Sequence, residues 1–257
     1  MARPVTLLTG ASAGIGAELA RVFARNGHEL VLVARRDAQL KALAEDIAGA
    51  GATKPHVLPL DLGRPAAVSA IETELQRLGA EPAFVVNNAG FGLRGPAAEL
   101  DPGEQLAMID VNVRALTALS LRWVDSIARH RGGILNVASI AAFMPGPDMA
   151  VYHATKAYVL SFTESLHAEL APKGVRVTAL CPGPVHTEFQ ARAGIPDDYF
   201  PEILAQPADR VAREGYEGLM RGRRVVIPGF ANKAMALLLR FVPHGLLLWA
   251  LRRRQRS

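Results

Sequence analysis

The chain has 257 residues, of which 50% are hydrophobic and 21% are charged. This balance is typical of a soluble globular protein and excludes a disordered or collagen-like chain. The net charge is +5, but the last six residues contain four arginines, so the remainder carries only +1 and no basic nucleic-acid-binding face is expected.

The single cysteine, Cys181, excludes an internal disulfide and a cysteine-rich zinc site, and it fits a reducing compartment. The amino terminus, MARPVTLLTGASAG, has neither the charged lead nor the long apolar run of a secretion signal. We therefore expect a cytoplasmic protein. We also expect no metal site, because no second histidine and carboxylate repeat accompanies His153 and His167, which we interpret as structural or solvent-facing.

Short apolar runs alternate with longer helical patterns along the chain. The runs predict seven strands, at residues 5–9, 29–34, 56–60, 84–87, 133–139, 176–182 and 224–228. Apolar residues recur at spacings of three and four between them, which predicts helices within 17–27, 38–51, 65–79, 101–130 and 150–170. Gly27, Gly51 and Gly79 fall where helix-ending glycines belong.

The strand runs show almost no polar alternation, as is required of a parallel sheet covered by helices on both faces. We therefore predict an α/β fold with a doubly wound parallel sheet of about seven strands. The length would allow two small domains, but α/β chains of this size often fold as one unit. We expect a catalytic domain over residues 1–232, with a substrate segment at about 188–222, and an apolar, then arginine-rich extension over 233–257.

A glycine-rich turn, TGASAGIGAELA, follows the first predicted strand and places Gly10, Gly14 and Gly16 before a helix. Glycines allow a tight turn and a close approach of the backbone to a diphosphate, and the helix amino terminus adds free N–H groups. A nucleotide phosphate is thus the expected ligand. The alternative is a turn of purely structural use.

Further short patterns follow in order along almost the whole chain, several of them directly after a predicted strand. They are Asp61-Leu62, Asn87-Asn88-Ala89-Gly90, Asn112 in DVNV, Ser139, Tyr152 with Lys156, and Pro182-Gly183 with Thr187. With the glycine-rich turn, they resemble the short-chain dehydrogenase/reductase superfamily from about residue 5 to 190. The amino-terminal half is most similar to its ketoacyl reductase and hydroxysteroid dehydrogenase branch. The resemblance implies a single-domain Rossmann fold.

Tyr152 and Lys156 are four residues apart in a predicted helix, so their side chains share one face. The resemblance implies that Asn112, Ser139, Tyr152 and Lys156 form a catalytic tetrad. Tyr152 would be the general acid and base, with its pKa lowered by Lys156 and by the positive charge of an oxidised nicotinamide, and Ser139 would hold and polarise the carbonyl oxygen. Lys156 would also bond the nicotinamide ribose, and Asn112 would position a water. The alternatives are a core aromatic for Tyr152, a cap for Ser139 and a buried amide for Asn112.

Arg35 and Arg36 follow the second strand, where an acidic residue would bind the ribose hydroxyls of NAD. A guanidinium pairs instead with a 2′-phosphate, so NADP(H) is favoured as the cofactor. The alternative is a pair of solvated arginines that start a helix. One departure from NADP-preferring relatives is Ala13, which stands where many of them carry a basic residue.

The remaining cofactor contacts rest on the resemblance. Asp61 would accept from the adenine amino group, with a helix cap as its alternative role, and the Asn88 to Gly90 run would wall the adenosine side, with a tight turn as the alternative. The complete expected set is Gly10, Ser12, Ala13, Gly14, Ile15, Gly16, Arg35, Arg36, Asp61, Leu62, Asn88, Ala89, Gly90, Tyr152, Lys156, Pro182, Gly183, Val185 and Thr187. Some of Phe91, Phe143, Met144, Phe189 and Tyr199 should wall the substrate pocket.

The segment KAMALLLRFVPHGLLLWALRRRQRS, from residue 233 onward, is more apolar than a surface tail should be. Arg240, Pro243, His244 and Gly245 interrupt it well short of the roughly 20 clean residues that a spanning helix needs. Three uses stay open: a substrate lid or subunit contact, a peripheral membrane contact through its arginines, and plain packing.

The sequence therefore predicts an NADP(H)-dependent oxidoreductase that interconverts a carbonyl and a secondary alcohol, with a small lipid-like or acyl molecule as substrate. We expect a homodimer or homotetramer in the cytoplasm, with membrane association through the C-terminal segment as an open possibility. The alternative function is a non-catalytic NADP(H)-binding protein with a regulatory or scaffolding role.

Overall fold

The computed structural model describes residues 2–196, 199–239 and 241–255. Residues 197 and 198 of the expected substrate segment, and residues 240, 256 and 257 of the C-terminal extension, lie outside the described residues.

Seven parallel strands form one sheet in the order β3-β2-β1-β4-β5-β6-β7. The strands are β1 (Arg3–Thr9), β2 (Leu30–Ala34), β3 (His56–Pro59), β4 (Ala80–Asn87), β5 (Gly133–Val137), β6 (Arg176–Leu180) and β7 (Val225–Val226). The chain runs outward from β1 to β3 and then returns to add β4 beside β1, which is the doubly wound arrangement. The predicted fold class is therefore confirmed.

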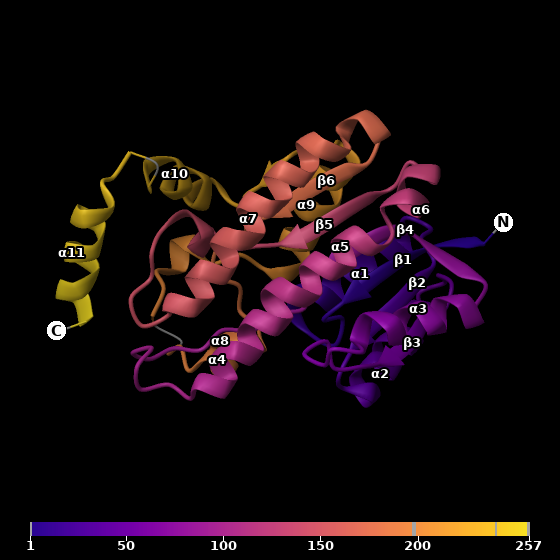
Figure 1. The fold of residues 1–257 in the computed structure, drawn as a ribbon, viewed down its shortest axis with the longest axis horizontal. Coiled ribbons are helices and arrows are strands. Elements are labelled where there is room, and N and C mark those ends of the chain that lie inside the picture. Colours follow the sequence, from indigo (N-terminus) through magenta and orange to yellow (C-terminus); the bar gives the residue numbers. More distant parts are fainter. Residues whose placement is uncertain (1, 197–198, 240, 256–257) are drawn as a thin grey trace.

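Helices cover both faces of this sheet (Figure 1). In chain order they are α1 (Gly14–Arg25), α2 (Asp37–Gly49), α3 (Ala67–Arg77), α4 (Pro102–Ile109), α5 (Leu116–Arg122), α6 (Val124–Arg129), α7 (Ala150–Leu170), α8 (Glu188–Ala193), α9 (Ala208–Met220), α10 (Phe230–Leu239) and α11 (His244–Gln255). Single turns of helix lie at η2 (Ile140–Phe143), η3 (Ala171–Lys173) and η4 (Glu202–Leu204).

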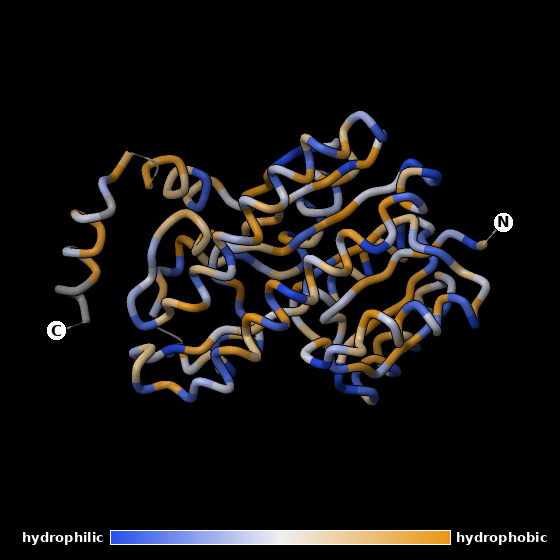
Figure 2. The backbone as a smooth tube through the Cα atoms, in the orientation of Figure 1, coloured by the Kyte–Doolittle hydropathy of each residue, from blue (hydrophilic) through white to orange (hydrophobic). Residues whose placement is uncertain are grey.

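Two hydrophobic cores lie on opposite sides of the sheet because successive residues of a strand point to opposite faces. Leu8 and Val86 pack in the core that contains residues of α1, α2 and α9. Their neighbours Leu7 and Val85 pack in the core that contains residues of α3, α5, α6 and α7. Figure 2 shows the strands as mainly hydrophobic runs in the middle of the molecule, as the lack of polar alternation predicts.

The segment 101–130, predicted as one helical region, is divided. Between α4 and α5 lies a π-helical turn, η1 (Asp110–Ala115), and a break at Trp123 separates α5 from α6. Turns of π-helix are rare and are found frequently at functional sites, and this one carries Asn112. A π-helical turn lengthens the helical repeat by one residue only. The spacing of hydrophobic residues at three and four positions therefore cannot reveal it.

The C-terminal helices lie at one end of the molecule. α10 adjoins the body near η4 and η2, whereas α11 stands away from it (Figure 1). Among the described residues, no helix combines the length and the apolar character needed to cross a membrane.

Candidate active site

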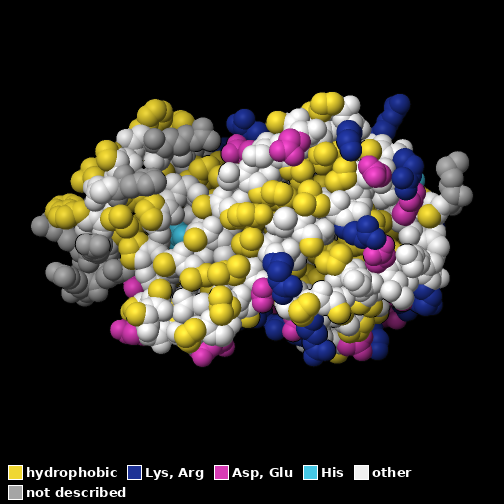
Figure 3. Space-filling view, in the orientation of Figure 1, with side chains coloured by type: hydrophobic (Ala, Val, Ile, Leu, Met, Phe, Trp, Pro, Cys, Tyr) yellow, Lys and Arg dark blue, Asp and Glu magenta, His cyan; other side chains and the backbone are white. Residues whose placement is uncertain are grey.

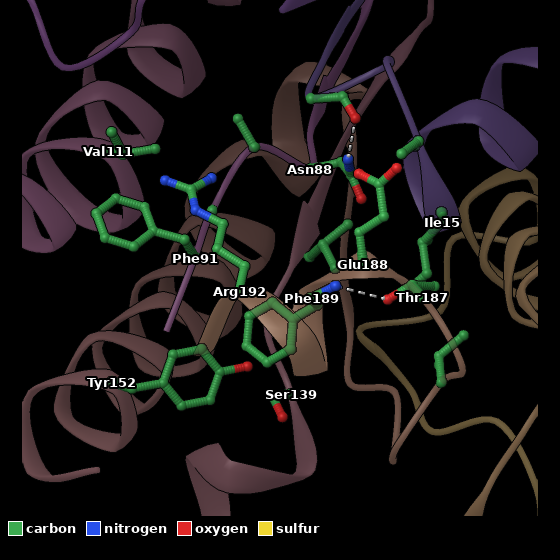
Figure 4. Close-up of a pocket in the computed structure, with 18 of the residues that line it drawn as sticks. Ile15, Asn88, Phe91, Val111, Ser139, Tyr152, Thr187, Glu188, Phe189 and Arg192 are labelled. Carbon is green, nitrogen blue, oxygen red and sulfur yellow. Dashed lines mark hydrogen bonds between the residues drawn. The ribbon is translucent and has the colours of Figure 1, made fainter. Parts of the chain in front are cut away.

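A cavity of about 430 Å³ opens at the carboxyl ends of the parallel strands, where doubly wound sheets bind their ligands. Figure 4 shows side chains from several elements pointing into it. The structure brings nearly all predicted site residues to this cavity: Gly10, Ser12, Ala13, Gly14, Ile15, Gly16, Arg35, Arg36, Asp61, Leu62, Asn88, Ala89, Gly90, Ser139, Tyr152, Lys156, Gly183, Val185 and Thr187. Asn112 and Pro182 lie behind this lining.

The turn between β1 and α1 needs its glycines. Gly10 and Gly14 have φ angles of +67° and +55°, in the left-handed region that favours glycine. A side chain on Gly16 would collide with the Gly10 carbonyl and with the Asn88 amide. The N-cap, Ala13, offers no side-chain cap, so the first N–H groups of α1 have no capping side chain and face the cavity edge.

Thr9 and Asn88 hold this turn against the end of β4. The Asn88 Nδ2 donates to the carbonyls of Thr9 and Gly10 over 3.1 and 3.0 Å. The Thr9 hydroxyl in turn accepts from the backbone N–H groups of Asn88 and Ala89, both at 3.2 Å. Sequence reasoning missed Thr9, although its position directly before Gly10 was the available signal. The Asn88 to Gly90 segment therefore braces the glycine turn.

Ser139, Tyr152 and Lys156 meet near the end of β5. Tyr152 lies in the first turn of α7, buried, with its hydroxyl directed into the cavity near Ser139 (Figure 4). The Lys156 Nζ lies 5.7 Å from the centre of the Tyr152 ring and donates to the Val137 carbonyl over 2.8 Å. The Ser139 hydroxyl accepts from the Ala141 N–H at 3.1 Å. Its own hydrogen is thus free to be donated toward the phenol or a ligand.

The protonation of this group differs from the sequence-based expectation. Burial raises the pKa of Tyr152 to about 12, while a hydrogen bond with Ser139 acts in the opposite direction. Burial also lowers the pKa of Lys156 to about 8. The lowering of the phenol pKa that was expected from Lys156 is not seen in the chain alone, because desolvation of the phenolate is the largest influence on this pKa and outweighs the Ser139 hydrogen bond. The phenol is therefore neutral at pH 7 and holds its proton. The lowering expected from an oxidised nicotinamide stays a prediction.

Asn112 supports the site from behind. Its Oδ1 accepts from the Phe91 N–H at 3.1 Å, and its Nδ2 donates to the Phe91 carbonyl and to the Thr155 hydroxyl at 3.0 and 3.1 Å. The π-turn η1 is thereby tied to the loop after β4 and to α7, next to Lys156. Asn112 is thus a buried amide whose hydrogen bonds join neighbouring segments, which was the alternative role considered for it. Its role in positioning a water stays a prediction.

Arg36 joins three segments at the far end of the cavity. Its Nε and Nη2 donate to the Ser12 hydroxyl over 3.3 and 3.2 Å, and its Nη1 forms a 2.7 Å ion pair with Glu188. Arg35 is exposed and lines the same cavity. Both guanidinium groups therefore lie at the cavity edge beside the glycine turn.

Asp61 and Leu62 line the cavity after β3. The Asp61 Oδ1 accepts from the Gly63 N–H at 3.0 Å. The residue at the N-cap of α3 is Ala66, so Asp61 does not cap that helix and this alternative was wrong.

The segment after β6 places Pro182 to Thr187 between the cavity and α10. The Pro182 carbonyl accepts from the Ile140 N–H at 2.9 Å, which joins β6 to the segment that carries Ser139. The hydroxyl of Thr187 caps α8 by accepting from the Phe189 N–H at 3.3 Å (Figure 4). A side chain on Gly183 would collide with the buried Asn232 amide of α10. Asn232 lies in the C-terminal part of the chain, where the resemblance offers no specific motif, so the sequence did not indicate this residue.

The wall of the cavity near Tyr152 is apolar. Of the five residues named as candidates, Phe91, Met144 and Phe189 line the cavity, whereas Phe143 and Tyr199 are not among the lining residues. The cavity is also lined by side chains that the sequence did not indicate as pocket residues: Met149, His153, Ile195, Arg192 and Phe200. The His153 ring is held by the Met144 carbonyl at 2.9 Å, and burial lowers its pKa, which fits the structural role expected for it.

Arg192 extends from α8 into the cavity. Its guanidinium carbon lies 4.4 Å from the centre of the Phe91 ring (Figure 4). Burial, together with the charges of Arg35 and Arg36, lowers its pKa. Arg35, Arg36 and Arg192 thus place positive charge at one end of the cavity. Arg192 comes from the segment after β6.

Among the described residues, no group of three or more His, Cys, Asp and Glu side chains is placed to hold a metal ion. The buried Cys181 at the end of β6 has its pKa raised to about 12 by burial, so it is an unreactive thiol.

Comparison with known families agrees with this geometry. Residues 4–196 match the family model described as short chain dehydrogenase. The chain belongs to the short-chain dehydrogenase/reductase family. The resemblance inferred from the motifs is thereby confirmed.

Similar members of the family cover most of the chain. Sulfoacetaldehyde reductase 2 from Chromohalobacter salexigens is 36% identical over 72% of this chain and 74% of its own length. A short-chain dehydrogenase from Sphingobium yanoikuyae, solved in complex with NADPH, has a TM-score of 0.82 and 35% identity over 95% of both chains. The bulky-bulky ketone specific alcohol dehydrogenase from Comamonas testosteroni has a TM-score of 0.77 and 28% identity, covering 95% of this chain and 96% of its own.

Proposed function

We propose that the protein is an NADP(H)-dependent oxidoreductase that interconverts a carbonyl and a secondary alcohol. The observation that carries this proposal is the convergence of the Ser139 and Tyr152 hydroxyls in one apolar-walled cavity that extends to the glycine turn and the two arginines. We assign the catalytic unit to residues 1–232, with the substrate segment at about 188–222 and an extension over 233–257.

The residues present fit a dinucleotide. A side chain at Gly16 would fill the close approach between the turn and the end of β4, and the start of α1 has no capping side chain. Both features suit a diphosphate held by backbone N–H groups. The turn residues would hold the diphosphate, Asp61 and Leu62 the adenine side, and Val185 and Thr187 the nicotinamide side. When bound, the nicotinamide supplies or accepts the hydride.

Arg35 and Arg36 support a preference for NADP(H) over NAD(H). Arg36 already binds the Ser12 hydroxyl of the glycine turn, so its guanidinium lies beside the expected ribose and can reach a 2′-phosphate there. The NADPH named for the Sphingobium yanoikuyae dehydrogenase agrees with this preference.

The chain's own groups would carry the proton. Ser139 accepts from the Ala141 N–H and so has a hydrogen to donate to a carbonyl oxygen. Tyr152 is neutral at pH 7 and can deliver its phenolic proton to the same oxygen. The phenolate that results would be stabilised by the ammonium of Lys156, which the Val137 carbonyl holds in place. Asn112 fixes this arrangement through Phe91 and Thr155.

The lining of the cavity near Tyr152 supports a lipid-like or acyl substrate. Phe91, Met144, Met149 and Phe189 offer apolar surface there, and hydrophobic walls with a few polar groups are typical of sites for apolar ligands. The Comamonas testosteroni neighbour, specific for ketones with two bulky substituents by its description, agrees with a roomy apolar pocket.

We also propose a homodimer or homotetramer. Leu106, Ile109, Leu121 and Tyr158 are exposed on α4, α5 and α7, and Figure 3 shows a band of hydrophobic side chains over the face that carries these helices. A contiguous exposed apolar surface of this kind marks an interaction site.

The test is the oxidation of NADPH by purified protein in the presence of ketones, acyl ketones and steroids, followed by absorbance. We expect turnover with at least one bulky ketone and slower turnover with NADH. Tight NADPH binding without turnover on any of these classes would favour the alternative, a non-catalytic regulatory or scaffolding protein. Absence of NADPH binding would overturn both.

A further inference from the structure

The outer face of α10 is apolar although it faces solvent. Phe230, Leu237, Leu238 and Phe241 have exposed fractions of 85%, 56%, 65% and 78%. At 100° per residue Phe230, Leu237 and Leu238 fall on one side of α10, and the buried residues Asn232 and Ala236 fall on the other; Phe241 lies in the turn that follows. α10 is thus docked on the body through one side and presents a second apolar stripe outward.

The next helix extends this apolar surface. Leu246 and Trp249 of α11 are also more than half exposed, and α11 stands away from the body (Figure 1). Figure 3 shows hydrophobic side chains gathered at this end of the molecule. Large exposed apolar patches are rare on monomeric proteins and mark interaction sites. We call Phe230, Leu237, Leu238, Phe241 and Leu246 the C-terminal apolar face.

A role as a lid over the cavity does not agree with the geometry. Among the described residues, none beyond Phe200 lines the cavity. Plain packing does not account for the C-terminal apolar face either, because its side chains are turned to solvent. An external partner is therefore required to cover it.

Charge identifies the chemistry of that partner. Residues 230–257, which contain α10 and α11, include six lysines and arginines and no aspartate or glutamate. α11 runs directly from Leu251 into the sequence RRRQ, so apolar and cationic positions adjoin. If this segment met the same segment of a second copy, it would bring cations together with no acidic side chain to pair with them. An anionic surface offers the complementary charge, and the acyl region beneath it accepts apolar side chains.

We propose that α10 and α11 bind the surface of an anionic lipid bilayer. The C-terminal apolar face enters the boundary between headgroups and acyl chains, while the cationic residues of 230–257 contact the lipid phosphates. The segment lies on the membrane and does not cross it, in agreement with the lengths of its helices. This inference is independent of the proposed reaction, because it uses residues outside the cavity.

Sedimentation of the full-length protein with vesicles tests it. Vesicles of phosphatidylcholine with phosphatidylglycerol are compared with vesicles of phosphatidylcholine alone, at low and high salt. We expect binding to the anionic vesicles at low salt and loss of binding at high salt. A Leu238→Ser and Phe241→Ser double variant should lose most of this binding. Replacing Arg252, Arg253 and Arg254 by Gln should weaken it about 100-fold, at roughly tenfold or less per arginine.

A matched control separates the C-terminal arginines from general effects of surface charge. Arg77, Arg210 and Arg213 replaced by Gln remove three exposed arginines elsewhere on the surface. This triple variant should sediment as the unchanged protein does. Thermal unfolding and NADPH binding of every variant report its folding.

Failure of the unchanged protein to sediment with anionic vesicles would overturn the proposal, and so would equal loss in the control variant. A Leu238→Ser and Phe241→Ser variant that keeps its vesicle binding but changes its mass in light scattering would show instead that the face is a subunit contact.

Discussion

The Nη1 of Arg36 lies 2.7 Å from the Oε2 of Glu188, so the N-cap residue of α2 is joined to the first residue of α8. Both side chains are partly exposed, and such ion pairs contribute little to stability. The pair has a different consequence. It occupies the guanidinium that we propose to bind the 2′-phosphate, and it places a carboxylate where that phosphate would lie.

Replacing Glu188 should therefore strengthen NADPH binding. In Glu188→Gln the carboxylate no longer competes with the phosphate for Arg36, and we expect the Kd for NADPH to fall about threefold, the effect of one exposed ion pair. The Kd for NADH, which lacks the phosphate, should stay the same. Fluorescence titration measures both. Glu202→Gln, another exposed acid in the same segment, is the control, and an equal gain for NADH would contradict the explanation.

Removing the two arginines after β2 should erase the cofactor preference. In a variant with Arg35→Ala and Arg36→Ala, the 2′-phosphate loses its charge-assisted hydrogen bonds, and NADPH binding should weaken by about 10- to 100-fold. NADH binding should change by less than about twofold. Arg25→Ala, which removes an exposed arginine at the end of α1, serves as the control. An unaltered ratio of the two dissociation constants would refute the assignment.

Local pattern was sufficient to predict most of this architecture. The apolar, β-branched runs predicted seven strands because buried parallel strands need apolar residues on both faces. The glycine turn after the first strand indicated that the ligand binds at the carboxyl ends of the strands. The four-residue spacing also put Tyr152 and Lys156 on one face of α7, as found.

Contacts between distant segments were not predictable in this way. Glu188 pairs with Arg36, and Arg192 lies over the ring of Phe91. The path of the chain after β6 brings these residues together, and no short-range period encodes that path. The pKa of Tyr152 depends on its burial, to which the ring of Phe189 at 5.4 Å contributes. A spacing argument supplied the nearby cation but not this desolvation, which raises the pKa of Tyr152 in the chain alone. The lowering of this pKa with an oxidised nicotinamide bound stays a prediction.

The phenol of Tyr152 should be essential for turnover and dispensable for cofactor binding. In Tyr152→Phe the ring and its packing on Phe189 remain, but the proton donor is lost. We expect kcat for ketone reduction to fall at least about 100-fold, as for loss of a general acid. The Kd for NADPH should be unchanged. Tyr158→Phe on the same helix removes a hydroxyl that bonds the exposed Thr117 hydroxyl, and it should retain full activity. Normal turnover of Tyr152→Phe would remove the residue from the mechanism.

Lys156 should make the folded protein more stable as the pH rises above 8. Its pKa is about 8 in the folded chain, against an ordinary value of 10.5, so the unfolded chain binds more protons between these values. Stability must then increase with pH in that window, by about 1 kcal/mol per pH unit. Tyr152 acts oppositely, but only above pH 10, where the unfolded phenol ionises and the folded one does not.

Urea unfolding of the unchanged protein and of Lys156→Met at pH 8 and 9.5 isolates this contribution. The difference in stability between the two proteins should shift in favour of the lysine protein at the higher pH. A difference that stays constant would mean that Lys156 keeps its ordinary pKa. Lys54→Met, at an exposed position, should show no such shift.

Gly183 should be intolerant of a side chain because of α10. An alanine there would collide with the amide of Asn232, which is buried and donates to the carbonyls of Leu204 and Pro228 over 3.1 and 2.9 Å. Since those bonds hold the amide in place, Gly183→Ala should lower the free energy of unfolding by about 1–3 kcal/mol.

The Gly183→Ala substitution should lower the free energy of unfolding much less when Asn232 is already alanine, because the colliding atoms are gone. Gly49→Ala, where the added carbon meets nothing within 4 Å, should not destabilise the fold. If the cost of Gly183→Ala were equal with and without Asn232, the collision would not be its cause.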